Sequence, residues 1–476
     1  MPCVVLTVAG CGGGQAAVAP PGDWVRARQL PGTELMSRQA AGNDGKAVVG
    51  TGITSVACTA RGECAASGGY VDEAFNFLVF VAGQYAGRWG RAGQVPGVAA
   101  LVGNGQAAQS EMVSGPFLSQ VSCSSPGNCA VAGNYQAPDP AEDTRPLLAD
   151  ERGGVWGRAK RISGPATAVL AISCPAAAGD CAAGGLSHWP YTTQDDAFVV
   201  NENGGVWGRA QLVSGSSGPI TTMSCPAAGS CLAAGTGGVP ATPFIVSERN
   251  GRWGPARQVP GFGRLTRGRS EVDSVSCADA GDCAVAGSFT DGSGRVQSFV
   301  ADERGGVWGT AEPVPGLAAL NKGGKARVTQ VSCDAAGSCA AGGWYLNLKG
   351  RERQQAWVDT EARGRWGLAE TVPGTAALNK GGNAAVTSVS CAAARCLAGG
   401  WYTGGAGPST QSGFLVTERR GAWRTAAQVP GLAALSTGGY ATVKAVSCAP
   451  SGWCAAVGDY TDRASSEGRM FVISGP

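Results

Sequence analysis

The sequence predicts an all-β protein folded as a single eight-bladed β-propeller, with four antiparallel strands in each blade. Three features predict this fold, since a Gly-x-Trp motif, a closely spaced cysteine pair and a short apolar run each occur eight times. Each repeat contains four strand-like segments, and no window shows sustained helical periodicity. Four short strands in roughly 40–50 residues match a propeller blade, because solenoid units are shorter and sandwich domains are longer.

The repeat around residue 330 shows the expected order of elements within one blade. A first strand is expected at 328–333, a second at 339–345, a third at 355–359 and a fourth at 365–372. The fourth segment carries the tryptophan of the motif and ends at Pro373-Gly374. Glycine-rich turns separate the segments, as short antiparallel hairpins require.

The cysteine pairs lie at the turn between the first and second segments of each repeat. Hairpin partners at this position come close enough for a disulfide. Each such short loop contributes roughly 2 kcal/mol of stability in the chain-entropy model. The predicted disulfides are Cys58–Cys64, Cys123–Cys129, Cys174–Cys181, Cys225–Cys231, Cys277–Cys283, Cys333–Cys339, Cys391–Cys396 and Cys448–Cys454.

The two ends of the repeat array predict how the ring closes. Segment 469–474 is the third strand of the eighth repeat, and no tryptophan motif follows it. Segment 22–31, which contains Trp24, is a fourth strand with no repeat before it. We expect these segments to pair, which completes the last blade and removes the exposed sheet edges. The expected organisation is a leader at 1–11, a flexible tether at 12–21 and the propeller at 22–476.

The leader predicts export and a lipid anchor. Its apolar run is too short to span a bilayer, and Val8-Ala9-Gly10-Cys11 resembles the lipobox of bacterial lipoproteins, which implies lipidation at Cys11. No Lys or Arg precedes the run, which departs from a signal peptide, so an unanchored apolar tail is the alternative. The anchor is the one membrane contact expected, on the outside of a bacterial membrane.

Composition independently favours an oxidising, extracellular compartment. Sixteen of the 18 cysteines fall into the eight local pairs, which is an even disulfide framework. Zinc is the alternative, but thiolate sites need four ligands at closer spacings and the chain has one histidine. We therefore expect no metal and no cofactor. The net charge is +3 with both signs interspersed, which predicts no nucleic-acid partner.

The turn before each tryptophan resembles a degenerate Asp-box, the Ser-x-Asp-x-Gly-x-x-Trp hairpin of sialidase-type propellers. Glu303, Gly305 and Trp308 occupy its acid, glycine and tryptophan positions, although Glu replaces Asp and the leading Ser is absent. The acid recurs as Glu151, Glu202, Glu248, Glu361 and Glu418. The resemblance implies a structural hairpin on the face away from catalysis. The carboxylate would accept turn amides or lie in solvent, and the tryptophan would pack between blades.

The repeat is also similar to a bacterial extracellular repeat named after its His-Ala-Phe tripeptide. Gln297-Ser298-Phe299 and residues 317–324 follow its outline, but the histidine is absent. This resemblance covers nearly all of residues 22–476 and implies no particular activity.

No catalytic constellation stands out in the sequence. Sialidase chemistry needs three arginines around a pocket, a Tyr/Glu pair and an Asp, and glycoside hydrolysis needs two facing carboxylates. The carboxylates on the loops are Asp72, Glu73, Asp195, Asp196 and Glu352. The single histidine, His188, is interpreted as a loop residue rather than a base.

The face opposite the disulfides is the predicted working surface, because its loops vary in length and content between repeats. Aromatic residues that suit sugar rings or protein contacts gather there. These candidates are Tyr70, Tyr135, Trp189, Tyr191, Trp344, Tyr345, Trp401, Tyr402 and Tyr460. The alternative is that about half of them pack between blades or fill the channel.

The sequence thus favours a non-enzymatic, secreted or surface-tethered propeller that binds a protein or carbohydrate ligand on this face. Two alternatives stay open. One is a propeller-type glycoside hydrolase or polysaccharide lyase, and the other is a purely structural protein of the cell envelope.

Overall fold

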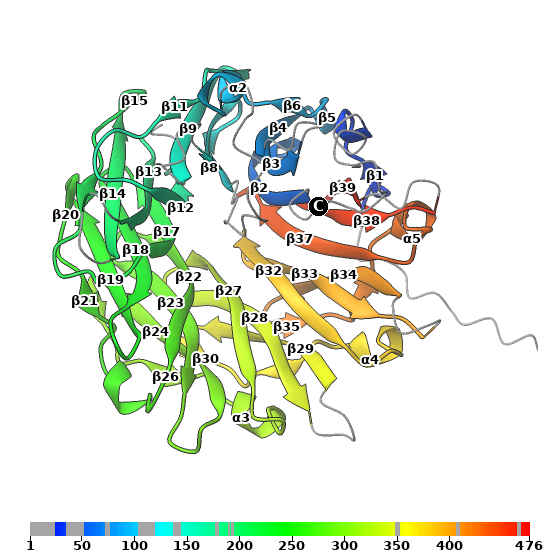
Figure 1. Ribbon diagram of the computed structural model, residues 1–476. Coiled ribbons are helices and arrows are strands. Elements are labelled where there is room, and N and C mark those ends of the chain that lie inside the picture. The colour runs from blue at the N-terminus through cyan, green and yellow to red at the C-terminus, as the bar shows by residue number, and fades with distance from the viewer. Residues whose placement is uncertain are drawn as a thin grey trace, which may run out of the picture.

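The computed structural model describes residues 24–34, 52–71, 77–102, 120–136, 144–176, 180–188, 191, 195–347, 353–405, 410–463 and 468–476. Eight antiparallel sheets stand side by side around a central axis and follow one another in chain order (Figure 1). The eight-bladed propeller expected from the repeat is therefore confirmed. The leader and the tether lie outside the described residues.

Blades 1 to 4 contain the first twenty strands after the N-terminal one. Blade 1 has β2 (Gly52–Ala60), β3 (Glu63–Val71), β4 (Phe77–Tyr85), β5 (Arg88–Trp89) and β6 (Gly93–Gln94). Blade 2 has β7 (Gln120–Ser125), β8 (Asn128–Gln136), β9 (Thr144–Arg152), β10 (Val155–Trp156) and β11 (Lys160–Arg161). Blade 3 has β12 (Ala168–Ser173), β13 (Ala182–Ser187), β14 (Asp196–Asn203), β15 (Val206–Trp207) and β16 (Gln211–Leu212). Blade 4 has β17 (Ile220–Ala227), β18 (Ser230–Gly237), β19 (Thr242–Arg249), β20 (Arg252–Trp253) and β21 (Arg257–Gln258).

Blades 5 to 8 repeat the same order. Blade 5 has β22 (Ser270–Asp279), β23 (Asp282–Thr290), β24 (Val296–Arg304), β25 (Val307–Trp308) and β26 (Glu312–Pro313). Blade 6 has β27 (Ala326–Ala335), β28 (Ser338–Asn347), β29 (Arg353–Ala362), β30 (Arg365–Trp366) and β31 (Glu370–Thr371). Blade 7 has β32 (Ala384–Ala392), β33 (Arg395–Thr403), β34 (Gln411–Arg419), β35 (Ala422–Trp423) and β36 (Ala427–Gln428). Blade 8 has β37 (Ala441–Cys448), β38 (Cys454–Thr461), β39 (Gly468–Gly475) and β1 (Arg28–Gln29).

The outermost strand of each blade is interrupted, which differs from the continuous strand expected at 365–372. In blade 6 both short pieces, β30 and β31, pair with β29. Between them the Ala369 N–H turns away and donates to the Pro315 carbonyl of blade 5 at 2.8 Å. Because of this interruption, the Ala369 N–H forms a hydrogen bond between blades instead of one within blade 6.

This inter-blade bond occurs at all eight crossings, with donor–acceptor distances of 2.6 to 2.9 Å. The donor and acceptor pairs are Ala27 with Pro430, Ala92 with Pro31, Ala159 with Pro96, Ala210 with Ser163, Ala256 with Ser214, Ala311 with Pro260, Ala369 with Pro315, and Ala426 with Pro373. The outer rim is therefore a closed circle of backbone hydrogen bonds.

The N-terminal strand closes the ring as expected. Arg28 pairs with Val472 and Gln29 with Phe471, in antiparallel register. On either side of this pair, the Leu30 N–H donates to Met470 at 2.9 Å and the Val25 N–H donates to Ser474 at 3.1 Å. The N-terminal strand β1 and the last strand β39 therefore lie side by side in blade 8.

The core is formed where the apolar third strands pack between neighbouring blades. Phe80, Phe198, Phe299, Phe414 and Phe471 are fully buried at matching positions, and Trp357 takes the same place in blade 6. Across the blade 4–5 crossing, the Phe262 ring packs on Phe299 with centroids 4.8 Å apart. Each apolar run is thus shared by two blades, which explains why no blade needs its own core.

Short helical turns, which the sequence did not predict, follow most of the outer strands. They are α2 (Val98–Val102), η1 (Phe262–Arg264), α3 (Leu317–Leu320), α4 (Thr375–Leu378) and α5 (Leu432–Leu435). Gly316, Gly374 and Gly431 precede three of them with φ of 77°, 83° and 80°, a conformation that favours glycine. One turn is too short to produce a helical period in the sequence. Among the described residues, none of the helices has the length and apolarity to cross a membrane.

Candidate functional site

The cysteine hairpins and the tryptophan hairpins lie on the same face of the ring, called here the disulfide face. All eight predicted disulfides form, with Cα–Cα distances of 3.9 to 4.1 Å. In blade 6 the Gly364 N–H of the tryptophan hairpin donates to Gly337 of the cysteine hairpin at 3.0 Å. Equivalent bonds recur in blades 1, 2, 4 and 5. The loops between second and third strands therefore project from the opposite side, called here the variable face.

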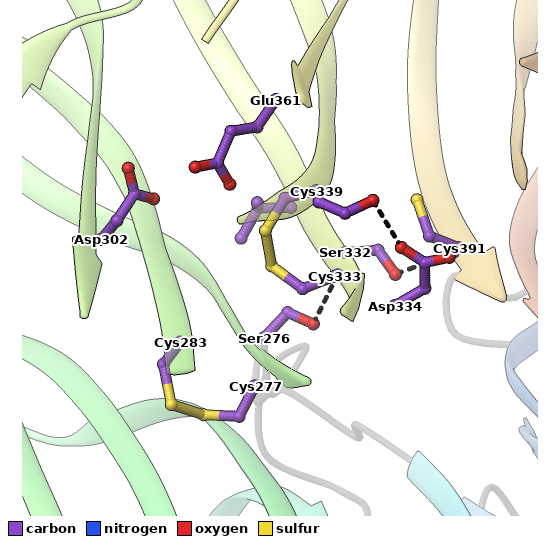
Figure 2. The surroundings of a disulfide bond; sticks show 12 residues. Ser276, Cys277, Cys283, Asp302, Ser332, Cys333, Asp334, Cys339, Glu361 and Cys391 are labelled. Atoms are coloured by element: carbon purple, nitrogen blue, oxygen red, sulfur yellow. Dashed lines mark hydrogen bonds between the residues drawn. A yellow bond between two sulfur atoms is a disulfide. The ribbon is translucent and has the colours of Figure 1, made fainter. Parts of the chain in front are cut away.

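A serine directly before the first cysteine links each blade to the next on the disulfide face. Figure 2 shows Ser276 of blade 5 accepting the Cys333 backbone N–H of blade 6, at 2.9 Å. The same bond is made at 2.9 to 3.0 Å by Ser122 with Cys174, Ser173 with Cys225, Ser224 with Cys277, Ser332 with Cys391, Ser390 with Cys448, and Ser447 with Cys58. Blade 1 carries Ala57 at this position, so its link to Cys123 is missing.

The Asp-box-like glutamates are buried rather than in solvent, and most accept a hydrogen bond from a side chain of the preceding blade, whereas the expected bond to a turn amide is made by Glu418. Glu361 is 1% exposed and accepts a hydrogen bond from Arg304 of the preceding blade. The preceding blade also supplies the donor to Glu151 (Tyr85), Glu202 (Arg152), Glu248 (Asn201) and Glu303 (Arg249). Glu418 differs and accepts the backbone N–H of Gly421 in its own hairpin.

Burial sets the protonation of these carboxyl groups. It raises the pKa of Glu202 to about 7, reinforced by the nearby Asp150 charge and opposed by the Cys181 N–H and Arg152. Burial also raises the pKa of Glu151, Glu248, Glu303 and Glu418. Since each group is enclosed and already bonded to a neighbouring blade or to its own hairpin, the arrangement supports a role in holding blades together.

The motif tryptophans pack between blades, as the Asp-box resemblance implies. The Trp207 indole N–H donates to Asp150 of the preceding blade at 2.8 Å, and Trp253 donates to Asn201 at 2.8 Å. Trp366 donates to Asp302 at 3.1 Å and Trp423 donates to Thr360 at 3.0 Å. The disulfide face therefore joins blades through cysteine hairpins, glutamates and tryptophans alike.

A cavity of about 360 Å³ opens on the disulfide face between blades 4 and 5. Its walls include both cysteine hairpins together with Glu248, Arg249 and Glu303. Glu248 accepts Asn201 and Glu303 accepts Arg249, so both carboxylates are already engaged. Sequence reasoning missed this cavity because the same glycine turns and acids recur in other blades and do not mark this crossing.

Five tyrosines of the predicted aromatic set are buried in the core. Tyr70, Tyr135, Tyr345, Tyr402 and Tyr460 are 2 to 6% exposed and belong to clusters that join neighbouring blades. The Tyr345 hydroxyl also lies 2.6 Å from Thr371 of its own outer strand. These rings pack between blades, which was the alternative stated for about half of the set.

Trp344 and Trp401 are the partly exposed aromatics of the set in blades 6 and 7. They occupy the same register position in the second strand, since Trp344 pairs with Arg327 and Ala356, and Trp401 pairs with Ala385 and Gly413. Blades 2, 4, 5 and 8 place short polar residues at this position, whereas blades 1 and 3 place Gly69 and Leu186 there. Asn134, Thr236 and Asp459 there hydrogen-bond the first strand of the next blade at 2.8, 2.8 and 3.1 Å. Blades 6 and 7 therefore present a partly exposed indole where blades 2, 4 and 8 present a structural polar group.

Blade 3 brings a histidine and a carboxylate together at the variable face. His188 Nδ1 lies 2.5 Å from Asp195, and both side chains are more than half exposed. Tyr191, which is 41% exposed, accepts a hydrogen bond at 3.3 Å from Arg145 of blade 2. Burial raises the pKa of the adjacent Asp196, and the Asp195 charge raises it further. Trp189, Asp72, Glu73, Glu352 and Cys11 lie outside the described residues.

The described part of the chain holds no cluster of three or more His, Cys, Asp or Glu side chains that could bind a metal ion.

No protein-family model matches this chain, and no curated protein sequence matches it. Solved structures with a similar fold include a Penicillium chrysogenum alpha-L-arabinanase, at 10% identity and a TM-score of 0.41 over 76% of this chain and 93% of that one. A PL25 ulvan lyase has 9% identity and a TM-score of 0.41, over 80% of this chain and 94% of that one. The Hadza microbial sialidase Hz136 has 10% identity and a TM-score of 0.35, and the match spans 64% of either chain. At these identities no activity follows from the likeness.

Proposed function

We propose that this protein is a non-enzymatic binding propeller of an oxidising, extracellular compartment, which holds a glycan or protein ligand on its variable face. Eight short disulfides support the compartment, because such bridges persist where thiols are not kept reduced. A surface tether through Cys11 belongs to the same proposal.

The observation that carries the proposal is the pair of partly exposed indoles, Trp344 and Trp401, at one register position of adjacent blades. Aromatic rings with one open side provide apolar contact area for a sugar ring or a protein side chain. The tyrosines beside them, Tyr345 and Tyr402, belong to the buried clusters that join the blades, whereas the two tryptophans belong to neither cluster.

The second candidate function is a polysaccharide lyase or glycoside hydrolase, and one observation favours it. An imidazole held by a carboxylate, as in His188 and Asp195, is an arrangement used by general bases. Tyr191 and Arg145 lie on the same side of blades 2 and 3. This group is on a different arc of the ring from Trp344 and Trp401, so the two candidates can be separated by mutation. A purely structural envelope protein remains the third candidate.

The test is a binding panel of polysaccharides and purified cell-surface proteins, measured by affinity electrophoresis and surface plasmon resonance. We expect a panel member to bind the wild type and to lose binding on Trp344→Ala/Trp401→Ala. Trp453→Ala is the matched control, because this indole lies in the cysteine hairpin of blade 8 beneath Arg61. Unchanged binding in the double variant contradicts the proposal. Release of oligosaccharides by the wild type, abolished by His188→Ala, would establish the enzyme instead.

A further inference from the structure

Exposed cations gather on one arc of the variable face, over blades 5 to 7. They lie at the strand ends opposite the disulfides and on the turns that connect the blades. Arg269 precedes β22, Lys325 precedes β27, and Arg353 begins β29. The arc comprises the exposed residues Arg264, Arg267, Arg269, Lys322, Lys325, Arg353 and Lys380, with the half-buried Arg295 and Arg327 between them. It is called here the cationic arc.

Few carboxylates neutralise the cationic arc. Glu271 forms a salt bridge with Arg327. Asp291 accepts the backbone N–H groups of Ser293 and Arg295, at 2.8 and 3.0 Å, and is thereby committed to its own loop. Within the described ranges, the seven exposed cations make no salt bridge. Burial lowers the pKa of Arg327 and the neighbouring Arg269 lowers it further, so these guanidinium groups are close enough to repel each other.

The cationic arc is continuous across two blade crossings. At the blade 5–6 crossing, Arg295 donates to the Asn321 carbonyl of the turn that leads into blade 6. At the blade 6–7 crossing, Arg353 lies so close over Gly382 that a side chain at that glycine would collide with its guanidinium group. Gly382 also has a φ of 94°, a conformation that favours glycine. Each crossing thus carries an arginine from one blade and a lysine from the next.

The lysines of the cationic arc are not required by the turns that carry them. The turns Asn321-Lys322-Gly323-Gly324 and Asn379-Lys380-Gly381-Gly382 have a counterpart without charge in blade 8, Ser436-Thr437-Gly438-Gly439. All three make the same bond from their first residue to the helical turn before it, at 2.9, 2.7 and 2.8 Å. In all three the N–H of the first glycine also donates to a carbonyl of the second strand, at 2.8, 2.9 and 3.0 Å. Thr437 shows that the backbone forms without a lysine.

We propose that the cationic arc, together with Trp344 and Trp401, binds a linear polyanionic polysaccharide bearing uronate or sulfate groups; this rests on the proposed function and names its ligand class. A row of unpaired cations matches a polymer with a charge on successive sugars, because each contact alone is weak and many act together. Indoles within the same arc provide stacking surfaces for the sugar rings. Cations that are scattered in the sequence gather at this end of blades 5 to 7 only once the blades close into a ring.

The test compares retention on alginate, a polyuronate, with retention on neutral dextran, using the full chain. The test variant, Lys322→Thr/Lys380→Thr, places in both lysine turns the threonine that the blade 8 turn carries. The matched control, Arg252→Thr/Arg365→Thr, removes the same number of positive charges from exposed tryptophan hairpins on the disulfide face. We expect alginate alone to be retained, with affinity about three- to tenfold weaker in the lysine variant at low salt. The arginine variant should match the wild type, and Thr437→Lys should bind at least as tightly. Raising the salt concentration should release alginate.

Three outcomes would overturn the inference. Equal retention of dextran and alginate, lost in Trp344→Ala/Trp401→Ala, would leave glycan binding intact but remove the role of charge. Tighter binding of single-stranded DNA or of phosphatidylglycerol vesicles than of alginate would assign the arc to another polyanion. If the lysine and arginine variants weakened alginate binding equally, the effect would come from the net charge of the protein and not from a site on the cationic arc. Failure of the proposed function would be a separate result. In that case, no polysaccharide or protein of the binding panel would lose binding when Trp344 and Trp401 are replaced.

Discussion

The two faces of the ring share one backbone but differ in how their side chains are used. On the disulfide face, the same contacts recur from blade to blade: a disulfide, a serine link and a tryptophan that reaches the preceding blade. On the variable face, equivalent turns carry lysine in blades 6 and 7 and threonine in blade 8. The comparison teaches that contacts between blades repeat closely on one side, whereas on the other the side chains at equivalent positions vary from blade to blade.

The residues that depart from the repeated contacts of the disulfide face lie mainly at the seam between blades 8 and 1. Gln84 replaces the buried glutamate in blade 1, and its amide donates to Ser474 of blade 8 at 3.0 Å. Gly475 takes the glutamate position in blade 8, where a side chain would collide with Trp24. The repeated pattern is thus altered where the chain ends have to meet.

The largest change in stability is expected when the disulfides, which lie on one face of the ring, are reduced. Each closes a loop of five to seven residues and contributes roughly 2 kcal/mol through the unfolded state. We expect reduction of all eight to lower the melting temperature by roughly 10 °C or more. Differential scanning calorimetry with and without dithiothreitol measures this, and an unchanged melting temperature would contradict the role given to this face.

A smaller effect is expected at Asp359, a buried acid found in one blade only. The other blades place an apolar residue at this position of the third strand: Ala82, Ala149, Val200, Val246, Ala301, Val416 and Ile473. Asp359 is 2% exposed, its Oδ2 has no hydrogen-bond partner, and burial raises its pKa to about 7. We expect Asp359→Val to stabilise the protein by about 1–3 kcal/mol at pH 8.

The pH dependence follows from the same burial. Because the folded-state pKa lies above the unfolded value of 3.8, the wild type loses stability as the pH rises from 3.8 through about 7. The advantage of Asp359→Val should therefore grow from pH 4 to pH 8. Asp359→Asn removes the charge and keeps the size. Urea denaturation at several pH values tests this, and an advantage that shrank with rising pH would be contrary to it.

The smallest change in stability is expected at Ala57, which stands where the other blades carry the serine that links one blade to the next. Ala57→Ser should restore the bond to the Cys123 N–H and stabilise the protein by about 1 kcal/mol. Ser390→Ala removes the equivalent bond to Cys448, which measures 2.9 Å, and should destabilise by a similar amount. Urea midpoints of the two variants should move in opposite directions. If both moved the same way, the serine would not act through this bond.

The sequence was sufficient for the ring, the disulfides and the closing strand, because each depends on features repeated eight times or on cysteine chemistry. It was insufficient for contacts between blades. The bond from Arg304 to Glu361 joins residues 57 positions apart, and no local pattern predicts it. Period-two alternation separates Trp344 from Tyr345, but it does not say which side the next blade covers. The cations of the arc are likewise scattered in the sequence and meet only in the closed ring.

The seam in blade 8 constrains the order in which the protein can fold during its synthesis. The residues around Trp24 are synthesised before blades 1 to 7, whereas their partner Phe471 is synthesised after those blades. The first strand must therefore wait, without a sheet to join, until nearly every other blade exists. A chain that stopped before β39 would leave β1 and β38 with bare strand edges, and such edges pair readily with other chains.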